Sequence, residues 1–141
     1  MTPARKTAKS SRIMNKADST RMQSIKDSGC ICCLLVTGKT QAPDVHHLTS
    51  GSRRKGHQAT IGLCGYHHRG LLDNQSKQFV SGLLGPSYAW GRRGFQEYFG
   101  RDELLLKIQN VVLNHFIENP WFDYEIPYCV KREAQHLWAA R

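Results

Sequence analysis

Two pairs of metal-binding residue types, each with two residues between its members, constrain this chain more than any other feature. Cys30 and Cys33 form the first pair, and Cys64 and His67 form the second. This spacing lets both side chains of a pair turn toward one ion without straining the backbone. The four ligands predict a closed, tetrahedral structural zinc site, which would also stabilise a small domain that has little strand.

The cysteine content favours zinc over a disulfide framework. The chain has five cysteines, an odd number, and they cluster beside histidines. Its N-terminus is basic and has no apolar leader, so we expect a reducing, cytoplasmic environment. The alternative is that the cysteines are reduced and buried as small apolar side chains. Cys32 can take the place of Cys30 or Cys33 at zinc, and Cys129 stands alone.

The net charge of +9 is concentrated at the N-terminus. Residues 1–26 carry seven lysines and arginines against a single acid, Asp18. Such a composition is typical of a disordered arm that a polyanion attracts, and nucleic acid is the partner we expect. A solubility tail is the alternative, whereas a membrane surface would require an apolar face that the arm lacks. The arm residues expected to bind DNA are Arg5, Lys6, Lys9 and Arg12.

The rest of the chain, residues 27–141, is predicted to be one α+β domain. Its core, residues 29–75, has a turn at the first cysteines, two short strands and then a helical turn. Glycines predict loops between residues 76 and 94, and apolar residues at helical spacing predict a helix from residue 101 to 117. The helical C-terminal part is expected to span residues 95–141. The shorter predicted elements are helix 18–26, strands 44–49 and 59–64, helical turn 65–75 and helix 131–140.

Histidines that zinc does not use predict a second metal site. Zinc would use His67 and leave His68, and a strand at residues 44–49 would point His46 and His47 to opposite faces. His46 and His68 could then bind a catalytic divalent cation, while His47 accepts a proton from water. Asp44 could orient one imidazole from outside the ligand shell. The alternative is that these histidines are structural or exposed side chains.

The stretches DVHHLTSG (44–51) and ATIGLCGYHH (59–68) resemble the HNH endonucleases, also called ββα-metal or His-Me finger enzymes. More narrowly, residues 29 to about 108 resemble the phage recombination enhancement function (Ref) family of RecA-dependent nucleases. This resemblance implies a ββα-metal core in which His47 is the general base and Asp44 supports the histidines. It further implies that His46 and His68 hold catalytic Mg²⁺ or Mn²⁺. The zinc ligands that it implies are Cys30, Cys33, Cys64 and His67.

Two positions depart from the family pattern. The asparagine of the HNH name falls near Ala59, which has no polar side chain, and His57 or Thr60 could take over holding the loop. Leu72, one helical turn after His68, cannot supply the further ligand that some relatives have there. Asp73 is the nearest substitute for that ligand.

The resemblance implies metal-dependent hydrolysis of DNA phosphodiester bonds in phage recombination, giving a 5′-phosphate and a 3′-hydroxyl. Basic residues around the histidines would hold neighbouring phosphates with little sequence preference. Their alternative role is a solvated loop. The resemblance also implies direction by a host RecA filament, hence action in the host bacterial cytoplasm. The phosphate contacts expected near the site are Arg53, Arg54, Lys55 and Arg69.

Two other functions fit parts of the sequence. A non-catalytic zinc module that binds DNA or a recombination partner would keep the four zinc ligands but would not need His46 and His47. A homing-type or toxin-like nuclease would be favoured by a large sequence-reading domain or an export signal, and neither is visible. The nuclease interpretation accounts for more of the histidines.

Overall fold

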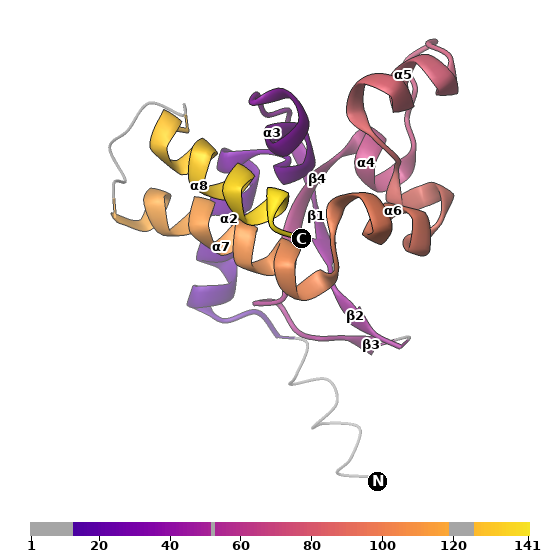
Figure 1. The fold of residues 1–141 in the computed structure, drawn as a ribbon. Coiled ribbons are helices and arrows are strands. Elements are labelled where there is room, and N and C mark those ends of the chain that lie inside the picture. Colours follow the sequence, from indigo (N-terminus) through magenta and orange to yellow (C-terminus); the bar gives the residue numbers. More distant parts are fainter. Residues whose placement is uncertain (1–12, 52, 119–125) are drawn as a thin grey trace, which may run out of the picture.

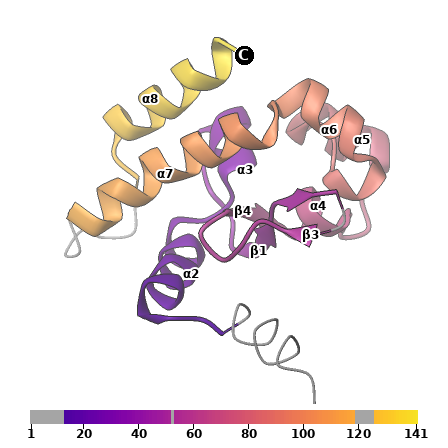
Figure 2. The ribbon, with the colours of Figure 1, turned by 90° about the horizontal axis from the view of Figure 1, so that it is seen from below.

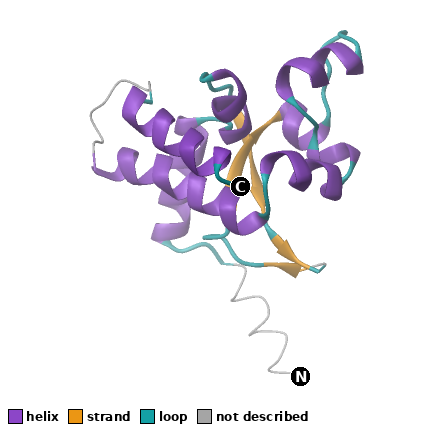
Figure 3. Ribbon diagram, viewed as in Figure 1, coloured by secondary structure: helices purple, strands orange, loops and turns teal. Residues whose placement is uncertain are grey.

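The computed structural model describes residues 13–51, 53–118 and 126–141. Helices surround a small antiparallel sheet (Figure 1 and Figure 3), so the predicted mixture of helices and strands is confirmed. Among the described residues, no helix is both long and apolar enough to cross a membrane. The elements in chain order are α2 (Lys16–Ser28), α3 (Ile31–Thr37), β1 (Pro43–His47), β2 (Thr49–Ser50), β3 (Arg53–Arg54), β4 (Thr60–Cys64), α4 (Gly65–Arg69), α5 (Lys77–Leu84), η1 (Tyr88–Trp90), α6 (Arg92–Phe99), α7 (Asp102–Glu118) and α8 (Tyr128–Ala139).

Strands β1 and β4 form an antiparallel pair at the centre of the molecule, with His46 opposite Ile61 and His47 opposite Thr60. All five residues of β4 are buried, whereas those of β1 are half-buried. Helix α4 begins immediately after β4, so both predicted strands and the predicted helical turn are present, with the short strands β2 and β3 in the segment between β1 and β4. A second pair, β2 with β3, projects beyond the first pair and carries Arg53 and Arg54 (Figure 1).

Helix α2 begins inside the segment that the sequence assigned to a basic arm. The side chain of Asn15 accepts from the Asp18 backbone N–H, and the Asp18 carboxylate accepts from the Asn15 N–H, which together fix the start of the helix. Ile25 is fully buried, and Arg21 donates to Thr60 on β4. Residues 16–26 therefore belong to the folded body and not to the arm. The predicted DNA contacts Arg5, Lys6, Lys9 and Arg12 lie outside the described residues.

The predicted turn at residues 29–33 is instead the start of helix α3. Gly29 adopts a positive φ of 90°, and the sulfur of Cys30 then accepts from the backbone N–H of Cys33 as an N-cap. Gly62 of β4 packs directly on this turn, since a Cβ atom there would lie 2.7 Å from the carbonyl oxygen of Gly29. The close approach places the ends of α3 and β4 side by side.

The C-terminal half is more helical than predicted. Helices α7 and α8 match the expected helices, but the segment predicted as loops contains all of α5 and the start of α6. Figure 2 shows α7 lying along α8 on the same side of the strands, and α7 also contacts α2 and β4. The core lies between these layers, where Phe99, Leu105 and Ile108 are fully buried. This packing gives β4 and α4 a rigid backing.

Candidate functional site

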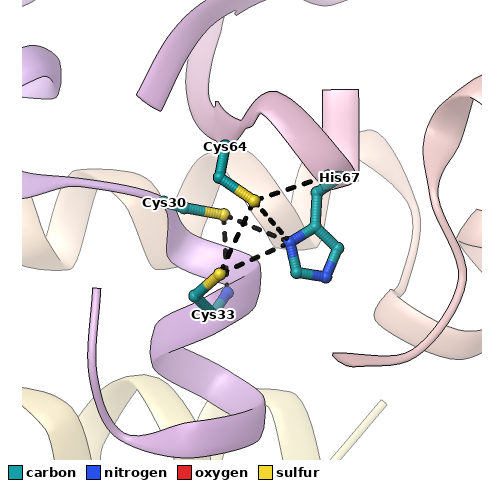
Figure 4. A group of neighbouring side chains, drawn as sticks. All are labelled: Cys30, Cys33, Cys64 and His67. Carbon is teal, nitrogen blue, oxygen red and sulfur yellow. Dashed lines mark hydrogen bonds between the residues drawn. The ribbon is translucent and has the colours of Figure 1, made fainter. Parts of the chain in front are cut away.

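Three cysteines and one histidine form a buried cluster between α3 and α4. Cys30 and Cys33 come from the start of α3, while Cys64 and His67 come from the end of β4 and from α4. Their side chains point toward one common centre (Figure 4). Their ligand atoms all lie within 4.8 Å of one another, so the group could hold a metal ion such as zinc.

The separations within the cluster fit tetrahedral coordination. Zinc–sulfur bonds of about 2.3 Å and zinc–nitrogen bonds of about 2.05 Å place two sulfurs about 3.8 Å apart, and a sulfur about 3.6 Å from a nitrogen. The Sγ atoms of Cys33 and Cys64 lie 3.7 Å apart. The Nδ1 atom of His67 lies 3.5 Å from the sulfurs of Cys30 and Cys33 and 3.2 Å from that of Cys64.

The surroundings of the cluster orient its ligands. The backbone N–H groups of Cys33 and His67 each donate to the first sulfur of their own pair, Cys30 and Cys64, at 3.4 Å. The Nε2 atom of His67 lies 2.8 Å from the carbonyl oxygen of Leu84, to which it donates. That hydrogen bond keeps the proton on Nε2 and turns the Nδ1 lone pair toward the sulfurs, as metal-binding histidines require.

The thiols of Cys30 and Cys33 in this cluster have very different pKa values. Burial raises the pKa of the Cys30 thiol, but hydrogen bonds from its neighbours outweigh burial and leave that pKa well below its ordinary value. Hydrogen bonds to Cys30 and Cys64 raise the pKa of Cys33 far above its ordinary value. The Cys30 thiolate thus forms readily, whereas Cys33 needs a bound cation to ionise.

The other two cysteines are not members of this group, although the side chain of Cys32 contacts that of Cys30. Cys32 is fully buried, and burial is the main reason that its pKa is raised well above its ordinary value. It is not among the four residues whose ligand atoms converge, so the choice within the first cysteines falls on Cys30 and Cys33. Cys129 is exposed on α8.

A second group of side chains lies at the other face of the strand–helix junction. His46 on β1 and His68 on α4 have ring centroids 5.1 Å apart. The Nδ1 atom of His68 lies 3.0 Å from Oδ2 of Asp44, and Nε of Arg69 donates to the same oxygen at 2.8 Å. The strand and the helix thus bring three of the predicted residues together, although the two histidines are 22 positions apart in the chain.

The charges around His46 and Asp44 favour a neutral imidazole and an ionised carboxylate. Burial, reinforced by the charge of His68, lowers the pKa of His46 to about 4. The hydrogen bond from His68 lowers the pKa of Asp44, and Arg69 adds to that effect against the opposing effect of burial. At neutral pH a nitrogen lone pair of His46 is therefore available, and Asp44 holds one nitrogen of His68.

His47 faces a different neighbour. Its Nε2 atom lies 3.4 Å from Nδ1 of His57, and the two rings are inclined at 72°. Burial lowers the pKa of His47, and the charges of Arg54 and His57 lower it further. His47 is thus neutral at pH 7, and it points away from the contacts of His46, as strand alternation predicts.

The basic side chains predicted near these histidines differ in the contacts that they make. Arg53, Arg54 and Lys55 are exposed on and after β3. Arg69 is 57% exposed but engages Asp44 through Nε, so it has a structural contact that the sequence did not predict. The predicted substitute ligand Asp73 is exposed after α4, and the structure gives no contact that links it to His46 or His68.

Distant parts of the chain supply contacts that sequence reasoning missed. The ring of Tyr88 on η1 lies 4.6 Å from that of His46, and the charges of Arg92 and Asp102 also act on His46. Arg92 donates to Asp102 at 3.0 Å. No local pattern marks these residues, because they reach the site only through the packing of α6 and α7 beside the strands.

A cleft of about 660 Å³ lies between α2 and α7, outside the predicted site. Its wall includes Lys16, Arg21 and the side chain of Gln58, which follows His57 in the chain. Arg21 is already committed to Thr60 and Asn110. None of the predicted metal ligands lines this cleft.

Comparison with known proteins matches most of this chain to one family. A family model described as recombination enhancement, RecA-dependent nuclease matches residues 15–114, which include both groups of side chains. No curated protein and no solved structure matched the chain.

Proposed function

The chain belongs to the recombination enhancement, RecA-dependent nuclease family, and from that membership we propose that it is a metal-dependent endonuclease of the HNH type. Its substrate would be DNA, cut during phage recombination under the direction of a RecA filament in the host cytoplasm. The family description itself names a nuclease, recombination enhancement and RecA dependence. The contact between His46 and His68 beside Asp44 carries the finer assignment, because it joins histidines from a strand and the following helix.

The thiol cluster is proposed to hold a structural zinc ion. Three sulfurs and one imidazole are ligands that zinc prefers, their separations fit a tetrahedron, and all four residues are buried without an open position for substrate. The ion would connect α3 to β4 and α4. It would thereby fix the helix that carries His68 against the strand that carries His46.

The catalytic cation is proposed to bind His46 and His68. The imidazole of His46 is neutral, and Asp44 occupies Nδ1 of His68, which leaves Nε2 of His68 as its available ligand atom. In metal sites, a carboxylate commonly accepts a hydrogen bond from a ligating histidine in this way and orients its ring. A bound Mg²⁺ or Mn²⁺ ion would stabilise negative charge on the scissile phosphate and on the leaving oxygen.

His47 is proposed to be the general base. It would take a proton from water, the resulting hydroxide oxygen would bond to phosphorus, and the P–O3′ bond would break. The leaving oxygen would take a proton from solvent, which gives a 5′-phosphate and a 3′-hydroxyl. The lowered pKa of His47 supports this role because a base must be unprotonated at working pH. Arg53, Arg54, Lys55 and Arg69 would contact flanking phosphates, joined by the N-terminal arm.

A cleavage assay separates this proposal from a non-catalytic binding module. Purified protein with Mg²⁺ or Mn²⁺ should cut DNA, tested with and without RecA filaments, and His47→Ala should remove cutting but keep zinc content and DNA affinity. His136→Ala, an exposed histidine on α8, is the matched control and should cut normally. Equal behaviour of the wild type and His47→Ala on every DNA form would favour the binding module.

A further inference from the structure

The side chain of His57 meets His47 on the face of β1 away from His46. Their nitrogens, Nδ1 of His57 and Nε2 of His47, lie 3.4 Å apart, and the ring centroids are 5.6 Å apart. Two imidazoles in this arrangement share one proton, with one ring as the donor and the other as the acceptor. The contact therefore couples the tautomer of His47, that is, which of its nitrogens carries the hydrogen, to the tautomer of His57.

The backbone around His57 is anchored from several directions, so the position of this backbone does not depend on the contact with His47. The hydroxyl of Thr60, which is fully buried, donates to the carbonyl oxygen of His57 at 2.9 Å. The same hydroxyl oxygen accepts from Nε of Arg21 at 2.9 Å. On the other side, the amide of Gln58 donates to Asp18 at 2.8 Å. The loop is thereby fixed to α2 at Gln58 and at Thr60.

Two backbone hydrogen bonds complete this support. The N–H of Ala59 donates to the carbonyl oxygen of Gly56, which closes a tight turn around His57. The N–H of Leu48 donates to the carbonyl oxygen of Ala59, which connects the turn to the residue that follows His47. Both imidazoles are thus carried by segments that are hydrogen-bonded to each other.

We propose that His57 is a positioning residue that holds the imidazole of His47 and fixes which of its nitrogens carries the hydrogen. This inference rests on the proposed nuclease function of His47. If Nε2–H of His47 donates to His57, then Nδ1 of His47 keeps its lone pair and faces away from His57. His47 would then accept the proton of water at Nδ1, and its Nε2–H would remain bonded to His57 in the resulting imidazolium.

The nearby acid strengthens this arrangement. The carboxylate of Asp18 is close enough to His57 for the two charges to interact, and it is held by Gln58 and by the N–H of Asn15. Asp18 thus anchors the segment that carries His57, because it accepts from the side chain of the next residue, Gln58.

Two substitutions separate positioning from simple packing. His57→Phe keeps a ring of similar size but removes the acceptor, whereas His57→Gln keeps an acceptor. Loss of a group that orients a functional histidine typically lowers activity about 10- to 100-fold. We expect that fall in kcat for His57→Phe with KM and zinc content unchanged, and recovery to within about threefold of the wild type for His57→Gln.

Imidazole NMR provides a readout that a structural role would not change. In zinc-loaded wild-type protein, the Nε2–H proton of His47 should be protected from exchange with water. That signal should disappear in His57→Phe and persist in His57→Gln, while backbone amide signals of β4 stay unchanged. His136→Phe provides the matched control on an exposed surface.

Three outcomes decide between the explanations. Wild-type activity together with an unchanged His47 signal in His57→Phe would overturn the positioning role. Equal losses of activity and of β4 signals in both variants, or failure of both to fold, would show that His57 supports only the loop and would also overturn it. A wild type that cuts no DNA, but whose His47 signal disappears in His57→Phe, would remove the nuclease function while the histidine contact stands.

Discussion

The substitution Asp44→Asn tests whether Asp44 orients His68 for a metal ion. In the native protein, Oδ2 of Asp44 accepts from both His68 and Arg69, at 3.0 and 2.8 Å. Asparagine has one acceptor oxygen and no charge, so it cannot hold both donors equally well. A carboxylate behind a ligating histidine contributes about 10- to 100-fold to activity or metal affinity, which is about 1.4–2.7 kcal/mol.

The folding free energy should change much less. The side chain of Asp44 is 36% exposed and that of Arg69 is 57% exposed. An ion pair at this level of exposure contributes at most about 1 kcal/mol, which corresponds to a shift of roughly 2–4 °C in Tm. The expected signature is therefore a large loss of cleavage with nearly native stability.

Single-turnover cleavage at a series of Mn²⁺ concentrations measures both quantities for Asp44→Asn. We expect a higher half-saturating Mn²⁺ concentration, a lower maximal rate, or both. Asp27→Asn is the control, because Asp27 is an exposed acid on α2 that accepts from Gln23 and lies outside the predicted site. Cleavage by Asp44→Asn at the wild-type rate and with the wild-type Mn²⁺ dependence would show that Asp44 does not act through His68.

Three further predictions concern metal, charge and pH. Removal of the bound ion with a strong chelator, or Cys33→Ser, should lower Tm by well over 10 °C. The reason is that a structural zinc site contributes about 10–16 kcal/mol of binding free energy to a fold of this size. Thermal melts with added Zn²⁺ measure this change, and an unchanged Tm would contradict the prediction. The double variant Arg53→Glu, Arg54→Glu should bind DNA more weakly in a fluorescence titration. The salt dependence of its affinity should be smaller by the amount expected for about two lost phosphate contacts. Arg132→Glu on α8 is the control in this titration. The folded pKa of His46, about 4, lies below the unfolded value of 6.5, so the unfolded chain binds more protons between these values and stability falls as pH falls from 6.5 to 4. In urea unfolding of the zinc-loaded protein without added Mg²⁺ or Mn²⁺, His46→Gln should lose less stability than the wild type across that interval, and an equal loss would contradict the assignment.

Local spacing was sufficient to predict the thiol cluster. Two ligands on a turn with two residues between them must approach one another. Only the meeting of the first pair of ligands with the second pair depended on the fold. The strand–strand–helix order also followed from alternation and glycine placement. The alternation of β1 further predicted that His46 and His47 would have different neighbours, and they do.

The sequence was less informative where packing decides structure. The helix expected at residues 18–26 is present, but the charge of this segment suggested an arm, whereas buried Ile25 and the bonds of Arg21 make the helix part of the folded body. Glycines at positions 82 and 94 suggested loops, although both lie within helices. The contacts of Tyr88 and Arg92 near His46 depend on how α6 and α7 pack, which no local pattern encodes.

The central claim is that two different ions serve this protein, one among the thiols and one between His46 and His68. Anomalous X-ray diffraction from crystals soaked in Mn²⁺, recorded at the zinc and manganese absorption edges, tests it directly. We expect a zinc peak enclosed by Cys30, Cys33, Cys64 and His67. We also expect a separate manganese peak within bonding distance of His46 and His68. Manganese found only at the thiols, or absent from both histidines when DNA is bound, would contradict it.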